Sequence, residues 1–159
     1  GSFKMDEVDV PEENVLGKVG EGFKIAMFAL DQGRFTVAAG ATGLIRACRD
    51  ASVKYAKERK TWGQPIATRQ SVAFSVADMR MELDGARLLV WEAAWQLDKG
   101  NPATKESYLA KLIADEMVLK VTDEAVMVMG GHGFIRENPV ERWLRNGRGF
   151  AVFEGLAMV

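Results

Sequence analysis

A strict heptad repeat between residues 72 and 97 limits most severely how this chain can fold. Its apolar residues are spaced alternately by four and three positions: Val72, Val76, Met79, Leu83, Ala86, Val90, Ala93 and Leu97. This spacing places them on one face of an α-helix, and that face must pack against other helices to be buried. A Gly100-Asn101-Pro102 sequence then ends the helix. The repeat therefore predicts one long helix of a bundle.

Two other segments show the three-to-four spacing of an amphipathic helix. The first, predicted to extend to about Lys57, contains Phe23, Ala26, Met27, Leu30, Val37, Ala41, Leu44, Ile45, Cys48 and Ala51. The second, which Asn101 or Thr104 can cap and Gly130-Gly131 ends, contains Ala110, Ala114, Val118, Val121, Ala125 and Val128. A shorter helix follows Pro139, and no alternating pattern typical of a strand is found. We therefore expect an all-α fold, an antiparallel four-helix bundle.

The chain divides into a short leading segment and one domain. Gly1-Ser2 is typical of the remnant of a cleaved tag, and residues 3–20 form an acidic, turn-rich linker with too few apolar residues to fold alone. Residues 21–159 are expected to form the helical domain. With 159 residues, of which 48% are hydrophobic, the chain can bury one core.

Composition argues against several classes of function. The formal net charge is -1, which gives no overall field to attract nucleic acid or an anionic membrane. No apolar run is long enough to span a bilayer, and the lone cysteine, Cys48, has no disulfide partner. The single histidine, His132, lies outside any Glu-x-x-His pair, so no metal site is predicted. We expect an intracellular protein, from a bacterial cytoplasm or, second, the mitochondrial matrix.

Three sequence features could carry chemistry, and each has a simpler interpretation. Glu154 stands among apolar residues, where loss of water raises the pKa of a carboxyl group and makes it a stronger base. The simpler interpretation is an exposed carboxylate near a chain end. The cluster Lys54, Lys57, Arg59 and Lys60 precedes Thr61 and Trp62; such a cluster more often offsets a helix dipole than binds phosphate. Gly130, Gly131 and Gly133 can end a helix or let a ligand approach the backbone.

Five segments, taken in order, resemble the acyl-CoA dehydrogenases. They are Asp-Val-Pro-Glu-Glu-Asn-Val-Leu-Gly, Gly-Glu-Gly-Phe-Lys-Ile-Ala-Met, Glu-Arg-Lys-Thr-Trp-Gly-Gln-Pro-Ile, Gly-Gly-His-Gly-Phe-Ile-Arg-Glu-Asn-Pro-Val-Glu-Arg and Phe-Glu-Gly. The resemblance covers almost the whole chain and identifies it as the C-terminal third of such a protein. It implies that residues 3–20 leave a middle β-domain, and that the isolated domain is inactive.

The resemblance also implies an activity and its residues. Glu154 would remove the α-proton of an acyl-CoA thioester while FAD accepts hydride from the β-carbon, in a flavin-dependent oxidoreductase of fatty acid metabolism. Gly155 would lie against the thioester, and Asp31 and Arg34 would line the substrate site. The flavin would be contacted, partly from a neighbouring subunit, by residues at the positions of Arg59, Lys60, Thr61, Trp62, Arg69, Gln70, Met127, Gly130 and Gly131.

Other implications concern partners and departures from the pattern. The family forms homodimers or homotetramers and passes electrons to an electron-transferring flavoprotein. Met127 stands where many members have a Gln that contacts FAD, Leu156 replaces a Thr, and Val159 stands where members commonly continue into another helix. Two alternatives stay open: an acyl-CoA oxidase or flavin monooxygenase on the same scaffold, and a non-catalytic assembly module whose heptad face drives association.

Overall fold

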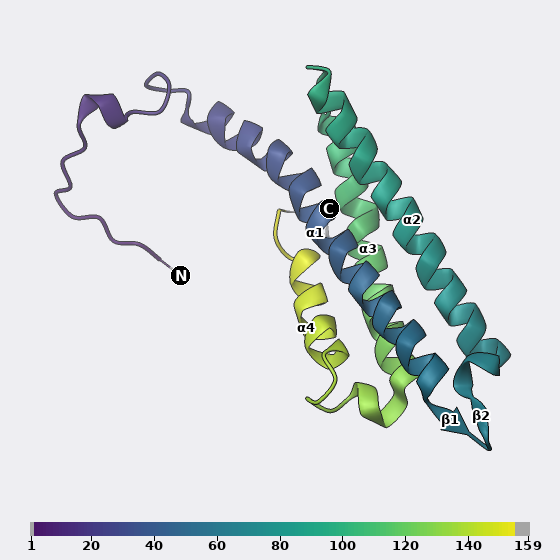
Figure 1. The fold of residues 1–159 in the computed structure, drawn as a ribbon. Helices are drawn as coiled ribbons and strands as arrows, with labels where there is room; N and C mark the ends of the chain where they lie inside the picture. The colour runs from purple at the N-terminus through teal and green to yellow at the C-terminus, as the bar shows by residue number, and fades with distance from the viewer. Residues whose placement is uncertain (1, 155–159) are drawn as a thin grey trace.

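A computed structural model describes residues 2–154 of the chain, which fold into four α-helices with a small β-hairpin (Figure 1). In chain order the elements are a 3-10 helix Glu12–Asn14, α1 Gly22–Glu58, β1 Lys60–Thr61, β2 Gln64–Pro65, a 3-10 helix Ile66–Thr68, α2 Gln70–Asp98, α3 Thr104–Met129, a 3-10 helix Gly130–Gly133 and α4 Val140–Phe150. Successive helices run in opposite directions, as the ribbon shows. The predicted antiparallel four-helix bundle is confirmed.

The core lies where α1, α2 and α3 meet, with α4 packed against α1 and α3. The central part of the heptad face, from Met79 to Ala93, is buried, and the predicted α3 stripe is buried from Ala110 to Ala125. Alanines recur on these faces, which lets the helix axes approach closely. The heptad face of α2 is therefore used inside the domain.

Burial also accounts for Cys48, which lies in the middle of α1 with no exposed surface. Loss of contact with water raises the pKa of its thiol from 9.0 to about 12. Cys48 is therefore a neutral, small core residue, as its place in the apolar pattern indicates.

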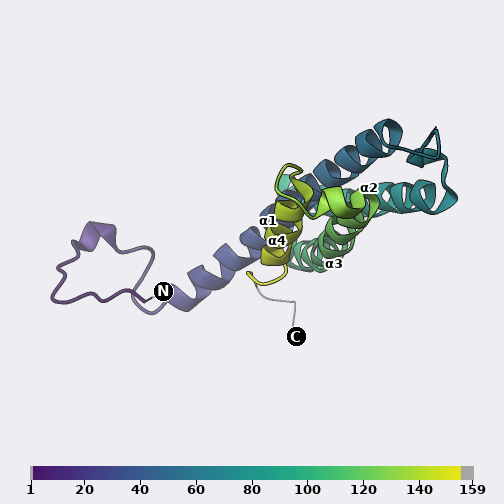
Figure 2. The same ribbon diagram turned by 90° about the horizontal axis from the view of Figure 1, so that it is seen from below.

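The first turns of α1 depart from the sequence prediction. Phe23, Ala26 and Met27 were expected to belong to the buried face, yet all three are exposed, with Phe23 at 77%. The reason is geometric: α1 is longer than its partners and extends beyond the bundle, as Figure 2 shows. The apolar periodicity is real, but nothing within residues 2–154 covers this end of the helix.

A second departure is the hairpin, because the sequence showed no alternating strand pattern. In β1 and β2, Lys60 pairs with Pro65 and Thr61 with Gln64. Strands of two residues are too short to show alternation. Their turn consists of Trp62 and Gly63, whose φ angles of 48° and 80° are both positive, as a tight type I′ turn requires.

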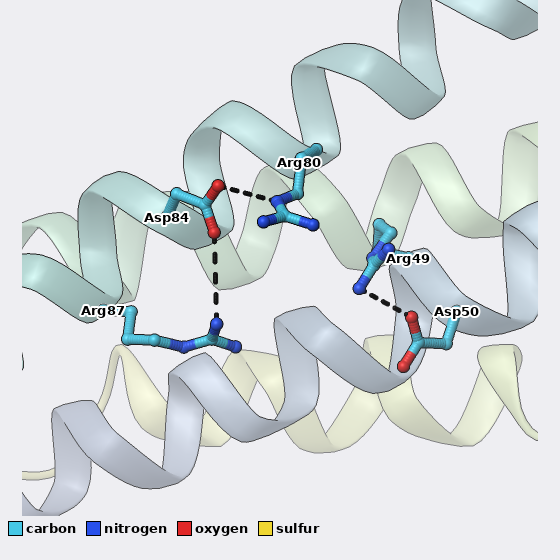
Figure 3. A network of polar contacts seen from close by, with 5 residues as sticks. All are labelled: Arg49, Asp50, Arg80, Asp84 and Arg87. Carbon is cyan, nitrogen blue, oxygen red and sulfur yellow. Dashed lines mark hydrogen bonds and ion pairs between the residues drawn. The ribbon is translucent and has the colours of Figure 1, made fainter.

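The charged residues between α1 and α2 mostly pair along their own helix (Figure 3). Asp84 lies 2.6 Å from Arg80 Nε and 4.0 Å from Arg87, and Arg49 pairs with Asp50 at 2.9 Å. The two pairs of Asp84, with i,i+4 and i,i+3 spacing, stabilise α2 by about 0.2–0.5 kcal/mol each. They do little to fix how the helices pack. None of the helices described here combines the length and apolarity that crossing a membrane requires.

Candidate active site

Glu154 lies beyond the C-terminal end of α4, in a turn that brings its side chain back onto α1. Its φ of 65° is in the left-handed region, which non-glycine residues seldom adopt. The residue is half-buried, and its carboxylate Oε2 is buried without a hydrogen-bond partner among the described residues. A buried oxygen in this state is costly for the fold, which is typical of a functional position.

A groove made by two glycines of α1 receives this segment. A Cβ atom on Gly33 would lie 2.8 Å from Glu154 Oε2, and one on Gly40 would lie 3.1 Å from the Phe150 ring. Gly33 and Gly40 are seven positions apart, so they lie on the same face two turns from each other. The absence of side chains at both positions therefore makes room for the end of α4 and for the carboxylate.

Asp31 and Arg34 flank Gly33 within one turn of α1. Arg34 donates a hydrogen bond to Asp31 Oδ1 at 2.7 Å, and Thr104 at the start of α3 donates one to Asp31 Oδ2 at 3.0 Å. Arg34 Nε is buried without a partner among residues 2–154. The structure thus brings Asp31, Arg34 and Glu154 to the same part of α1. Among the described residues, Arg34 Nε is a free donor there and Glu154 Oε2 is a free acceptor.

A cleft of about 290 Å³ adjoins this group. It lies between α1 and the loop that joins α2 to α3, and its lining includes Phe28, Asp31, Thr104 and Ser107. Gly155, which the resemblance places beside the substrate, lies outside the described residues.

The opposite end of α1 carries the second predicted group. Trp62, at the tip of the hairpin, is 92% exposed. Arg69 donates a hydrogen bond to the Thr61 carbonyl at 3.3 Å, and its guanidinium carbon lies 5.4 Å from the centre of the Trp62 ring. This cation–π contact favours one orientation of an exposed aromatic side chain.

Positive charge and free backbone donors also meet here. The side chains of Arg59 and Lys60 are exposed beside the hairpin, and Arg69 precedes α2 as its N-cap without a side-chain cap. The first N–H groups of α2, beginning at Gln70, therefore have no partner within the helix and favour an anion. The arrangement fits a phosphate-bearing ligand with an aromatic portion.

Met127, Gly130 and Gly131 lie at the end of α3, on the same side of the molecule as the hairpin. The ring of His132 lies 5.9 Å from that of Tyr55, near the end of α1. Gly130 adopts a φ of 56°, so it does end the helix, and the space above Gly130 and Gly131 is open. Gly133 differs, because a Cβ there would lie 2.6 Å from the Val126 carbonyl oxygen. Met127 is 74% exposed.

The two groups cannot meet within one chain. From residue 33 to residue 59, α1 rises about 39 Å at roughly 1.5 Å per residue. Figure 1 shows the hairpin at one end of the bundle and the end of α4 beside the other part of α1. The structure therefore forms two separate half-sites, one around Glu154 and one around the hairpin.

Sequence reasoning missed several residues that shape the first half-site. A glycine inside a helix, such as Gly33, often marks a close approach and could have been noticed. The Lys111–Asp115 pair gave no signal, because an i,i+4 charge pair normally lies on a solvated face. In the structure both residues are buried, and Lys111 has no exposed surface. Within residues 2–154 no cluster of metal-binding side chains is present.

Comparison with known proteins identifies the family of the chain. A family model described as the acyl-CoA dehydrogenase C-terminal domain matches residues 20–158. The mitochondrial short-chain specific acyl-CoA dehydrogenase of Mus musculus is 42% identical over 155 residues. Subunit CarC of the caffeyl-CoA reductase-Etf complex of Acetobacterium woodii is 44% identical over 155 residues. Each alignment covers 98% of this chain.

Solved structures give the same result. The structure of butyryl-CoA dehydrogenase from Megasphaera elsdenii matches with a TM-score of 0.91 and 42% identity, over 93% of this chain and 39% of that one. The chain spans 38% of the mouse protein and 41% of the Acetobacterium woodii protein. It thus corresponds to about two fifths of these relatives and belongs to the acyl-CoA dehydrogenase family, as its C-terminal helical domain.

Proposed function

We propose that this chain is the C-terminal domain of an FAD-dependent acyl-CoA dehydrogenase in which Glu154 is the catalytic base. The observation that carries the proposal is the unpaired carboxylate oxygen of Glu154, held against Gly33. Such an oxygen can accept the α-proton of a thioester without first losing a hydrogen bond. Asp31 and Arg34 would border the acyl-CoA substrate, and Gly155 would lie against its thioester.

The hairpin fits the flavin cofactor. Arg59, Lys60 and Arg69 would hold the pyrophosphate, because each guanidinium group can bind two phosphate oxygens and the ammonium group of Lys60 adds a third positive charge. Thr61, Trp62 and Gln70 would contact the cofactor beside them, and Gly130 and Gly131 would border its adenosine portion. Met127 would lie at a further position beside the cofactor. When bound, FAD supplies the acceptor for the β-hydrogen, and the product is an α,β-unsaturated thioester.

An oligomer completes the site in this proposal. Because the half-sites are about 39 Å apart along α1, the hairpin would serve the Glu154 of another copy. The outer face of α2 offers a surface for association: Phe74, Met81, Leu88 and Trp95 repeat every seven residues and are 52–65% exposed. A row of this kind packs well against its own copy in a dimer or tetramer.

Residues 3–20 would connect the bundle to the middle β-domain. Seven large apolar side chains in this segment are exposed in the chain as described: Phe3, Met5, Val8, Val10, Val15, Leu16 and Val19. Side chains of this kind need a covering surface, which an adjoining domain would supply. We accordingly expect the 159-residue chain alone to be inactive.

The names of the relatives suggest the first substrates and acceptor to test. The mouse relative is short-chain specific and the Megasphaera elsdenii structure is a butyryl-CoA dehydrogenase, so short acyl-CoAs come first. The Acetobacterium woodii relative belongs to an Etf complex, which supports an electron-transferring flavoprotein as acceptor. These relatives include a mitochondrial protein and a bacterial one, so either compartment fits.

The deciding experiment is anaerobic titration of the full-length flavoprotein with short acyl-CoAs, comparing the native protein with Glu154→Gln. The native flavin absorption should bleach, whereas the variant should bind acyl-CoA and keep its flavin oxidised. Removal of a general base lowers such rates by about 10²–10⁴-fold. Asp123→Asn is the control carboxylate, on exposed α3 surface. Bleaching of Glu154→Gln at the native rate would exclude the proposed role, and reoxidation by air rather than by the flavoprotein acceptor would indicate an oxidase.

A further inference from the structure

A buried lysine on α3 contacts the segment that carries Glu154. Lys111 has no exposed surface, and its ammonium nitrogen donates a hydrogen bond to the Phe150 carbonyl at 2.9 Å. Phe150 is the last residue of α4, where the carbonyl groups have no partner within the helix. A positive charge at this end also opposes the negative end of the helix dipole. Lys111 therefore fixes the point at which α4 ends.

The same nitrogen holds two other groups. It donates to the Asp115 carboxylate one turn along α3, and it lies 6.0 Å from the centre of the Phe153 ring. The Phe153 ring in turn lies 5.6 Å from that of Phe150. The contacts of one ammonium group thus include both ends of the turn from Phe150 to Phe153, and Glu154 is the next residue.

Asp115 balances the buried charge. Burial raises the pKa of the Asp115 carboxyl, and the hydrogen bond and charge of Lys111 act in the opposite direction. Its second oxygen, Oδ1, has no partner among the described residues. A buried ion pair seldom makes a fold more stable than apolar side chains of similar volume would. Stability alone therefore does not explain why this pair is present.

We propose that Lys111, balanced by Asp115, is a positioning residue that holds the turn after α4 so that the Glu154 carboxylate meets Gly33. This inference rests on the proposed function, because it assigns Lys111 a role only through Glu154. Glu154 lies four residues after Phe150 in a short turn, so a shift of the Phe150 carbonyl displaces the backbone that carries the carboxylate. The carboxylate lies close against Gly33, so a displaced Glu154 side chain has little space in which to return to the same position.

The test is the double variant Lys111→Met/Asp115→Leu of the full-length holoenzyme, which removes both charges together, so that neither charge is left buried alone, and takes the hydrogen bond away from the Phe150 carbonyl. A displacement of about 1 Å at a catalytic group can lower the rate by about 10²-fold, so we expect kcat per bound flavin to fall at least about tenfold. KM should change less than about threefold, because the substrate contacts of Asp31 and Arg34 are untouched. The isotope effect with α-deuterated acyl-CoA should rise, because proton removal becomes slower than the other steps.

Leu83→Ala is the matched control for stability. It truncates a core residue of α2, which packs on α1 and α3, and should lower the melting temperature without changing kcat per flavin or the isotope effect. A double variant that turns over at the native rate, or a loss shared equally by Leu83→Ala, overturns the inference. If the double variant does not retain flavin, Lys111→Arg replaces it. That variant keeps the charge beside Asp115 but enlarges the group below Phe150, and an unchanged kcat and isotope effect would overturn the inference.

Glu154→Gln separates this inference from the proposed function. Native turnover in Glu154→Gln overturns both at once. Loss of turnover in Glu154→Gln together with native turnover in the Lys111 variants overturns the positioning role alone and leaves the proposed base in place.

Discussion

The two parts of α1 that border the half-sites are built in opposite ways. Near Gly33, the half-site is assembled from residues far apart in the sequence, with Asp31, Thr104 and Glu154 brought together by three helices. At the other end, the hairpin half-site consists largely of consecutive residues between Arg59 and Gln70 and is exposed to solvent. The first arrangement suits proton transfer, which needs a fixed and partly dry carboxylate. The second suits binding a charged cofactor that another copy of the chain would share.

The strongest test of this comparison mixes two inactive proteins. One subunit would carry Glu154→Gln, and the other Arg69→Glu, which places a negative charge where phosphate is expected. Hybrid dimers should recover activity, because the native Glu154 of one subunit then meets the native hairpin of the other. Each hybrid dimer would then hold one intact site of its two, so purified hybrids should show roughly half of native activity.

The control is each variant assembled with itself, which should remain inactive. The readout is the rate of flavin reduction in hybrids purified through two different tags. If hybrids stay as inactive as the parent variants, both half-sites act within one subunit and the comparison fails.

A smaller effect is expected from Gly33→Ala. Alanine should stabilise an exposed helix position by about 1 kcal/mol relative to glycine, but here its Cβ would lie within 3 Å of the Glu154 carboxylate. We expect kcat to fall about 10²-fold while FAD binding at the hairpin is unchanged. Flavin affinity and kcat should be measured on the same preparation.

Gly43→Ala provides the matched control, because its added Cβ would meet no atom within 4 Å. It should give the same gain in helix stability with native activity. Equal kcat values for the two alanine variants would show that the groove at Gly33 does not hold the carboxylate.

The smallest effect concerns the middle of α1, where Cys48 lies between the half-sites. Because burial raises the pKa of the Cys48 thiol from 9.0 to about 12, the unfolded chain loses this proton at lower pH than the folded chain does. The stabilisation is complete below pH 9 and is lost as the pH rises towards 12. The free energy of unfolding should therefore fall by up to about 1.4 kcal/mol per pH unit above pH 9.

Urea unfolding of the 159-residue chain at several pH values between 8 and 10.5 would measure this slope, with Cys48→Ala as reference. The alanine chain should show a shallower slope. Identical slopes would mean that the middle of α1 opens to water and is not a rigid connection between the two ends.

The same contrast explains how much could be predicted from the sequence. The heptad from Val72 to Leu97 and the glycines after α3 are local patterns, so helix type and approximate limits were predicted correctly. The hairpin residues are contiguous, so their proximity required no knowledge of the fold. The burial of the Lys111–Asp115 pair and the contact of Glu154 with Gly33 depend on how α4 returns to α1. No local pattern encodes that return, and the roles of these residues stay predictions.

The exposed start of α1 shows what even a clear local pattern cannot predict. The pattern containing Phe23 and Met27 correctly predicted a helix, but periodicity shows only which face is apolar and not what covers it. That face extends beyond the other helices of this chain.

The glycines of α1 also affect how the protein moves. Gly33, Gly40 and Gly43 each weaken the helix by roughly 1 kcal/mol relative to alanine, and the fully buried core residues of α1 begin only at Ala38. Local opening should therefore occur more easily around residues 33–43 than around residues 45–56, and amide hydrogens there should exchange with solvent sooner. The groove that accommodates the Glu154 carboxylate thus lies in a part of the helix that opens before the buried part does, so a ligand that fills the half-site should slow this exchange.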